Sequence, residues 1–242
     1  VRDPSWVWRI TWRGKTLFRW SWKRSLLQRV LPVPFSARHV EYSLLASTDD
    51  DVRPSERLMR LALQAIQLAA ELRLEELDRR FSADFPYPPS LWPGQHYRLL
   101  AALTEILQPR CVVEIGTGGG VSALAFKHHL PPDRQEVTFD LIPWQEHSAS
   151  SLTPEDFADR RLIQYTDNLC DPEVFQRHQA LLSRAELILL DAAKDGVTEP
   201  RLLANLRQVP FLKPPLLVLD DIRVWTMLKV WREIPYPKLD LI

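Results

Sequence analysis

Cysteine and long apolar runs are both scarce in this sequence. Only Cys111 and Cys170 occur among 242 residues, too few for a disulfide framework and without the spacing of zinc ligands. The longest apolar runs, such as residues 216–219, have the length of a strand and fall far short of the ~20 residues that cross a bilayer. No secretion signal is recognisable near residue 1. The sequence therefore predicts a cytoplasmic protein with no membrane partner.

The chain also lacks a net charge. Lys and Arg together number 31, as do Asp and Glu, so no overall field draws nucleic acid to the surface and no nucleic-acid partner is expected. The charge is nevertheless uneven. Residues 1–40 carry nine basic side chains against one acid, together with five of the nine tryptophans. A hydrophobic share of 45% is enough for a globular core.

The tryptophans of this basic segment follow a period of two. Three Trp and Ile10 alternate with mostly polar residues over 6–13, and aromatic residues alternate with polar ones again over 18–23. With a turn at Arg13-Gly14-Lys15, this predicts a β-hairpin. An aromatic face beside a basic one suits single-stranded bases or a membrane surface. Because an isolated hairpin is marginal in water, we favour burial of the aromatic face against the main domain or a second copy of the chain. A homodimer through this hairpin is therefore one expectation.

The sequence pattern divides the chain into three segments. Residues 1–53 form the Trp-rich extension. Residues 54–93 contain a helix with Ser55 as its N-cap and apolar residues at steps of three and four from Leu58 to Leu72, followed by the proline-rich connection 85–93. Residues 94–242 form the main domain and begin with a predicted helix over 95–107.

From residue 111 onward, short apolar runs alternate with helical patterns. Strand-length runs occur at 111–115, 136–140, 161–165, 186–190 and 215–219, and helical patterns at 121–129, 154–158, 172–182 and 199–208. This alternation predicts an α/β fold with a doubly wound, mostly parallel sheet. Ligands of such sheets bind beyond the carboxyl ends of the strands.

A glycine cluster follows the first of these strands. Glu114 to Gly120 read E-x-G-x-G-x-G, and four of the seven glycines in the chain lie between residues 116 and 120. Glycine at such a turn lets a ligand approach main-chain N–H groups. The spacing differs from the G-x-G-x-x-G fingerprint of dinucleotide-binding proteins. It resembles the nucleotide loop of class I S-adenosylmethionine-dependent methyltransferases, which implies a Rossmann-like methyltransferase fold and cofactor contacts from Glu114, Gly116, Thr117, Gly118 and Gly120.

Acidic residues follow the later strands. Asp140 ends the second strand, where a carboxylate can accept hydrogen bonds from both hydroxyls of a ribose. Asp167 and Asn168 follow the third strand, where an adenine would lie, although a polar turn would look the same. Asp191 follows the fourth strand, and Asp220 and Asp221 follow the fifth. Since these two strands are expected to be neighbours, the three carboxylates would crowd together and favour a cation such as Mg²⁺, Mn²⁺ or Ca²⁺.

The runs LLDAAKDG (189–196) and VLDDI (218–222) narrow the resemblance. They are similar to those of the catechol and caffeoyl-CoA O-methyltransferase group, as is Gly94-Gln95. The resemblance covers about half of the chain. It implies that Asp191, Asp220 and Asp221 hold the divalent ion, that Asp191 also contacts the cofactor, and that Lys194 is the catalytic base. The implied activity is S-adenosylmethionine- and metal-dependent O-methylation of a small hydroxylated molecule with adjacent oxygens. Asp221 departs from the group, which usually has Asn there.

Other interpretations remain open. A metal-independent methyltransferase, another user of the same nucleotide fold such as an aminopropyl transferase, or a non-catalytic scaffold that interacts through the Trp-rich hairpin would each fit parts of the sequence. The strand-end acids could simply cap loops, and Trp144 and His147 could face the ligand or serve elsewhere. Because sheets of this family have seven strands and residues 239–242 can only begin the sixth, we expect the protein to continue beyond Ile242.

Overall fold

The computed structural model describes residues 7–12, 15–21, 52–80, 89, 95–147, 149–224 and 226–241. The chain divides into two units, Val1–Phe35 and Ser36–Ile242. In the described part of the chain, no helix is both long enough and apolar enough to cross a membrane.

The first unit contains the predicted hairpin. Strand β1 (Val7–Trp12) pairs antiparallel with β2 (Lys15–Ser21), with Trp8 opposite Trp20 and a shift of register after Ile10. The predicted turn at residues 13 and 14 and the side chains of both strands lie outside the described residues. Burial of the aromatic face and a dimer through the hairpin therefore stay predictions.

The second unit is built on a five-stranded sheet. Its strands are β3 (Cys111–Ile115), β4 (Gln135–Phe139), β5 (Leu162–Tyr165), β6 (Leu187–Leu190) and β7 (Leu216–Leu219). They lie in the order β5-β4-β3-β6-β7, and every neighbouring pair is parallel. The predicted doubly wound parallel sheet is confirmed. The chain first extends to one side of β3 and then returns to the other side, so the topological switch point lies between β3 and β6.

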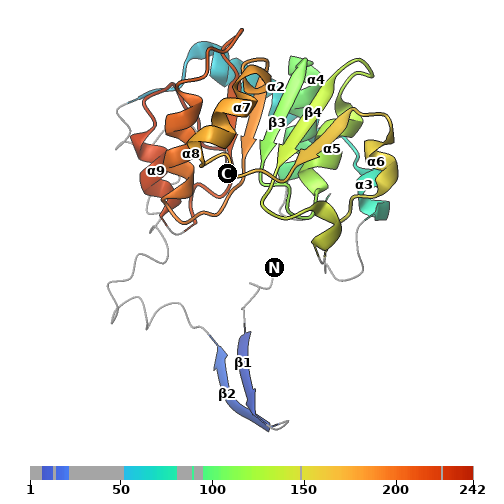
Figure 1. Ribbon diagram of the computed structural model, residues 1–242, viewed down its shortest axis with the longest axis vertical. Helices are drawn as coiled ribbons and strands as arrows, with labels where there is room; N and C mark the ends of the chain where they lie inside the picture. The colour runs from blue at the N-terminus through green and yellow to red at the C-terminus, as the bar shows by residue number, and fades with distance from the viewer. Residues whose placement is uncertain are drawn as a thin grey trace. The chain divides into compact units, whose positions relative to one another are not determined.

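Helices cover both faces of this sheet (Figure 1). One face packs on α7 (Pro172–Leu182), α8 (Thr198–Leu206) and α9 (Met227–Glu233), and the other on α2 (Glu56–Glu71), α4 (His96–Leu107) and α5 (Val121–His129). The alternation within β3 explains this arrangement, because Val113 faces the first layer and Val112 the second. The predicted N-cap of α2 is present, since Ser55 accepts a hydrogen bond from the main-chain N–H of Leu58.

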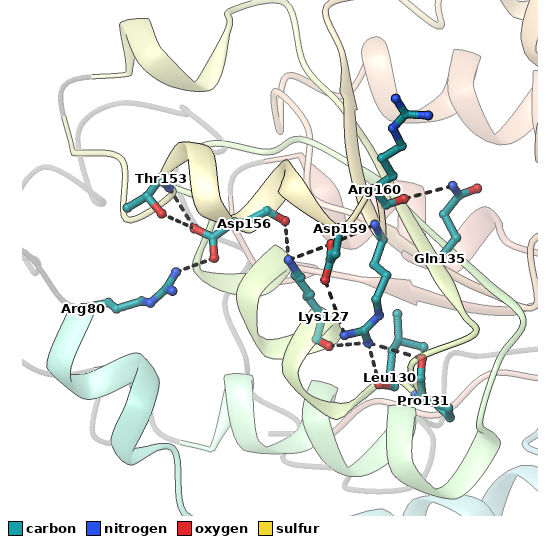
Figure 2. Close-up of polar contacts among 10 residues, drawn as sticks. Arg80, Lys127, Leu130, Pro131, Gln135, Thr153, Asp156, Asp159 and Arg160 are labelled. Atoms are coloured by element: carbon teal, nitrogen blue, oxygen red, sulfur yellow. Dashed lines mark hydrogen bonds and ion pairs between the residues drawn. The ribbon is translucent and has the colours of Figure 1, made fainter.

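Two ion pairs join the short helices α3 (Glu75–Arg80) and α6 (Pro154–Ala158) to each other and α6 to the end of α5 (Figure 2). Arg80 lies 2.6 Å from Asp156, and Lys127 lies 3.1 Å from Asp159. Asp156 also accepts the N–H of Thr153 at 2.8 Å, which completes a capping box. These contacts lie near the amino ends of β4 and β5. The candidate site lies at the opposite, carboxyl ends of the strands.

The C-terminal residues differ from the prediction. No strand begins at Leu239 within the described residues, and Ile242 lies outside them. Just before these residues, the Lys238 ammonium donates to the carbonyls of Trp231 (2.7 Å) and Ile234 (3.2 Å) at the end of α9. This contact satisfies carbonyls that a helix end leaves free and holds the segment against the helix. Helix α8 also begins one residue earlier and ends two residues earlier than predicted.

Candidate functional site

A cavity of about 680 Å³ opens at the carboxyl ends of the central strands. It lies at the topological switch point, where open α/β sheets bind their ligands, and its volume suits a cofactor or small molecule. Eight of the residues predicted from the sequence line it: Gly116, Thr117, Gly118, Gly120, Asp140, Asp167, Asn168 and Asp191.

Two glycines of the loop after β3 have different roles. Gly116 has a φ of +109°, and a Cβ there would lie 1.9 Å from the carbonyl oxygen of Asp191. This glycine therefore lets the ends of β3 and β6 approach each other. Gly118 has a φ of +47°, and a Cβ there would meet nothing within 4 Å. Because Gly118 lines the cavity, a side chain at this position would occupy space that a ligand can use.

Glu114 lies beneath the glycine loop rather than in the cavity wall. It is fully buried, and its carboxylate accepts hydrogen bonds from Ser122 Oγ and, at 2.7 Å, from Thr138 Oγ1. Thr138 in turn contacts Thr117 Oγ1 at 2.7 Å. Glu114 is thus linked to Thr117 of the glycine loop through the hydroxyl group of Thr138. Its direct contact with a cofactor stays a prediction.

Burial gives Glu114 an unusual titration. Burial raises the pKa of Glu114 to about 8, although the hydrogen bonds from Ser122 and Thr138 act to lower it. The unfolded chain ionises this group near its ordinary pKa of 4.5. The folded state therefore retains the proton between these values, and the free energy of unfolding falls as pH rises from about 4.5 to about 8.

We expect Glu114→Gln to flatten this part of the stability profile, because glutamine has no proton to lose. Urea unfolding of both proteins from pH 5 to pH 9 measures the effect, with a difference on the order of a few kcal/mol in the variant's favour at the alkaline end. Parallel profiles for the two proteins would show that Glu114 is not the group responsible.

Asp140 joins the loops after β3 and β4. Its Oδ2 accepts the N–H of Gly118 at 2.9 Å, and its Oδ1 accepts the N–H groups of Leu141 and Ile142 at 2.7 and 3.1 Å. Three main-chain donors therefore orient this carboxylate at the wall of the cavity. An ionised carboxylate has about four acceptor positions, so capacity remains for a ligand hydroxyl.

Asp167 and Asn168 continue the cavity wall after β5. Asp167 lies 2.7 Å from Nε2 of His178, whose ring packs edge-on against Phe139 at a centroid distance of 4.9 Å. The side chain of Asn168 accepts the N–H of Cys170 at 2.9 Å. Both residues are thus held by the protein itself, and their contact with an adenine stays a prediction.

The three acids predicted to hold a cation come together. Oxygen atoms of Asp191, Asp220 and Asp221 all lie within 4.8 Å of one another. They converge because β6 and β7 are paired, with Leu190 opposite Leu219. A set of carboxylate oxygens fits a hard divalent ion such as Mg²⁺. Asp191 belongs both to this cluster and to the cavity wall.

Lys194 extends into the same cluster. Its ammonium pairs with Asp191 and lies 3.3 Å from Asp221, and its side chain is only 8% exposed. Burial acts to lower the pKa of Lys194, but attraction to the carboxylates, Asp191 first, outweighs it and raises the pKa above its usual value. Burial raises the pKa of Asp191, which the charge of Lys194 opposes. The ammonium therefore neutralises part of the cluster.

Sequence reasoning missed two residues at the start of α4. Tyr97 lines the cavity, and burial, followed by the charges of Asp191 and Asp220, raises the pKa of its hydroxyl. Nδ1 of His96 lies 3.6 Å from Asp220. The sequence pointed to this helix only through Gly94-Gln95, which resembles a run of the O-methyltransferase group. That run does not predict which side chains of the helix face the site. Of the two loop residues considered earlier, His147 lines the cavity, whereas Trp144 stacks on Phe157.

No protein-family model matches this chain, and no curated protein sequence matches it. Solved structures of similar fold include the O-methyltransferase TomG from Streptomyces achromogenes in complex with S-adenosylmethionine, with 21% identity, a TM-score of 0.42 and coverage of 78% of this chain and 74% of that one. An O-methyltransferase from Bacillus cereus has 17% identity, a TM-score of 0.43 and coverage of 74% and 73%. At these identities the likeness concerns the fold alone.

Proposed function

We propose that this chain is an S-adenosylmethionine-dependent, divalent-metal-dependent O-methyltransferase acting on a small molecule with adjacent oxygens. The observation that carries the proposal is the position of Asp191. This residue borders the cavity beside the glycine loop and also belongs to the three-carboxylate cluster. A methyl donor in the cavity and an acceptor oxygen at the cluster would therefore be neighbours, as direct transfer requires.

The cavity residues support S-adenosylmethionine as the cofactor, which supplies a methyl group on a sulfonium. Gly118 leaves the wall open where a nucleotide would approach, and Asp140 retains acceptor capacity for a ribose hydroxyl. Thr138 joins Thr117 of the glycine loop to the buried Glu114, and Asp140 accepts the N–H of Gly118, so the loop is held by the protein itself. Such pre-organisation reduces the ordering that binding requires.

The carboxylate cluster supports the divalent ion. Asp191, Asp220 and Asp221 would hold it, and when bound it would lower the pKa of an acceptor hydroxyl. An acceptor with two adjacent oxygens, such as a catechol, a vicinal diol or a hydroxy-carbonyl, fits this chemistry best. Within the chain, Lys194 is the candidate proton acceptor. Its raised pKa makes it a base only when positive charge in the cluster offsets the three carboxylates.

One observation favours a second candidate, a metal-independent methyltransferase. The Lys194 ammonium already pairs with Asp191 and Asp221, so the protein itself supplies a positive charge to the cluster. In that case Lys194 would remain charged and the acids would act as structural partners of the lysine.

Transfer of a labelled methyl group to a panel of catechols, vicinal diols and hydroxy-carbonyl compounds tests the proposal. We expect product with at least one member of the panel in Mg²⁺ or Mn²⁺, and none in excess chelator. Undiminished transfer in chelator would favour the metal-independent candidate. No transfer to any member of the panel under either condition would contradict the proposed function.

A further inference from the structure

The loop between β6 and α8 holds Lys194 in a backbone conformation that lysine rarely adopts. Its φ is +59°, in the left-handed region that suits glycine and, to a lesser degree, asparagine and aspartate. A lysine remains there only when its surroundings determine the conformation. The same backbone directs the side chain toward Asp191 and Asp221. Whatever stabilises this conformation therefore also positions the ammonium.

Glu199 makes the contact that stabilises it. This residue lies in the first turn of α8, is fully buried, and accepts the main-chain N–H of Lys194 on Oε1 at 2.5 Å. Its Oε2 is buried and has no hydrogen-bond partner among the described residues. A buried carboxylate with an unpartnered oxygen is costly for folding. Overall stability is therefore a poor explanation for an acid at this position.

Glu199 is also not needed to cap its own helix. Asp195 accepts the N–H groups of Val197 and Thr198 at 2.8 and 2.7 Å, so it satisfies two donors at the start of α8. Between these two acids, Gly196 packs so closely on Thr226 that a Cβ would lie 2.3 Å from its Oγ1. The loop is thus restrained at three points, and of these only the contact with Glu199 acts on the main chain of Lys194.

We propose that Glu199 is a positioning residue, which fixes the Lys194 ammonium at the carboxylate cluster through the main-chain N–H of Lys194. The positioning itself does not depend on what the cavity binds. Its effect on turnover rests on the proposed methyltransferase function. If Lys194 acts in that reaction, a displacement of about 1 Å can lower the rate by about 100-fold.

Two conservative variants separate the hydrogen bond from the charge. Glu199→Gln keeps an acceptor oxygen at the same reach and removes the charge. Glu199→Asp keeps the charge but is one methylene too short to reach Lys194. Asp195→Ala is the matched control, because it weakens the start of α8 and leaves the contact of Glu199 with Lys194 intact.

The first measurement is the rate at which acetic anhydride acetylates Lys194 in the folded protein, by peptide mass spectrometry, relative to Lys229, whose side chain is 80% exposed. We expect severalfold faster labelling of Lys194 in Glu199→Asp and wild-type labelling in Glu199→Gln and Asp195→Ala. Equal labelling of Lys194 in Glu199→Asp and wild type would overturn the proposal. So would equal acceleration in Asp195→Ala, or acceleration in Glu199→Gln to the level of Glu199→Asp.

The second measurement is methyl transfer, where Glu199→Asp is expected to lower kcat by about 100-fold with little change in KM for S-adenosylmethionine. Glu199→Gln should retain a kcat close to that of the wild type. An equal loss in both variants would contradict a role through the hydrogen bond. Because labelling requires no turnover, the positioning can hold even if the proposed function fails, so the two failures are distinguishable.

Discussion

Gly118→Val is expected to weaken binding of S-adenosylmethionine by at least about 100-fold, which corresponds to about 2.7 kcal/mol. The side of Gly118 that would carry a Cβ faces open space in the cavity, so valine would fill the volume that the nucleotide requires. Calorimetric titration of the folded variant measures the effect. Wild-type affinity in this variant would contradict the assignment of the cavity.

A matched variant separates occupation of the cavity from backbone strain. Gly118 has a φ of +47°, and a β-branched residue there is strained by roughly 1–2 kcal/mol. Asparagine tolerates this conformation better and still fills the space. We therefore expect Gly118→Asn to lose cofactor binding as well, with a smaller loss of stability than Gly118→Val. If Gly118→Asn binds normally, strain rather than occupation explains the valine variant.

Asp191→Asn is expected to abolish turnover and to weaken binding of Mg²⁺ or Mn²⁺ by about 100-fold, or about 2.7 kcal/mol. Asp191 is the acid shared by the cavity and the cluster, and it is the closest partner of Lys194. Turnover with a catechol acceptor and titration of Mn²⁺ followed by electron paramagnetic resonance measure the two effects. Unchanged Mn²⁺ affinity would indicate that the carboxylates are structural.

The same chemical change at Asp221 is the control. The side chain of Asp221 is 51% exposed and its φ is +51°, a conformation that asparagine adopts readily. Asp221→Asn should therefore fold normally and retain activity with weaker ion affinity.

Lys194→Met should raise the affinity for the ion, because it removes a positive charge that competes for the cluster. It should also lower turnover while leaving cofactor affinity unchanged.

The sheet and most helices of its layers could be predicted because their signals are local. Proline at the first helical position and a following polar stretch set helices over 154–158 and 172–182, and both have these bounds in the structure. Helix α9 was missed because Met227–Glu233 is short, and α3 because its six residues are mostly charged. Neither has the long apolar repeat that identifies α2.

Site residues that come directly after a strand could be predicted from the sequence. Residues whose position depends on tertiary packing could not. The glycine loop after β3 and the convergence of the three acids could be predicted from their places after strands, whereas their roles came from the resemblance and stay predictions. The position of Glu114 beneath the loop depends on which face of β3 each side chain takes. Lys194 pairs with the cluster through a left-handed backbone conformation, which a lysine in the sequence does not predict. Tyr97 and His96 reach the site only because α4 packs against the sheet.

Calorimetric titration of the wild-type protein with S-adenosylmethionine, in Mg²⁺ and in excess chelator, tests the central claim most directly. The claim is that one site combines a nucleotide cavity with a cation cluster through Asp191. We expect binding of one cofactor per chain in both conditions. A separate titration with Mg²⁺ alone should show ion binding that Asp191→Asn weakens by about 100-fold. Absence of cofactor binding in both conditions would contradict the account, and cofactor binding without any Mg²⁺ binding would replace it with the metal-independent alternative.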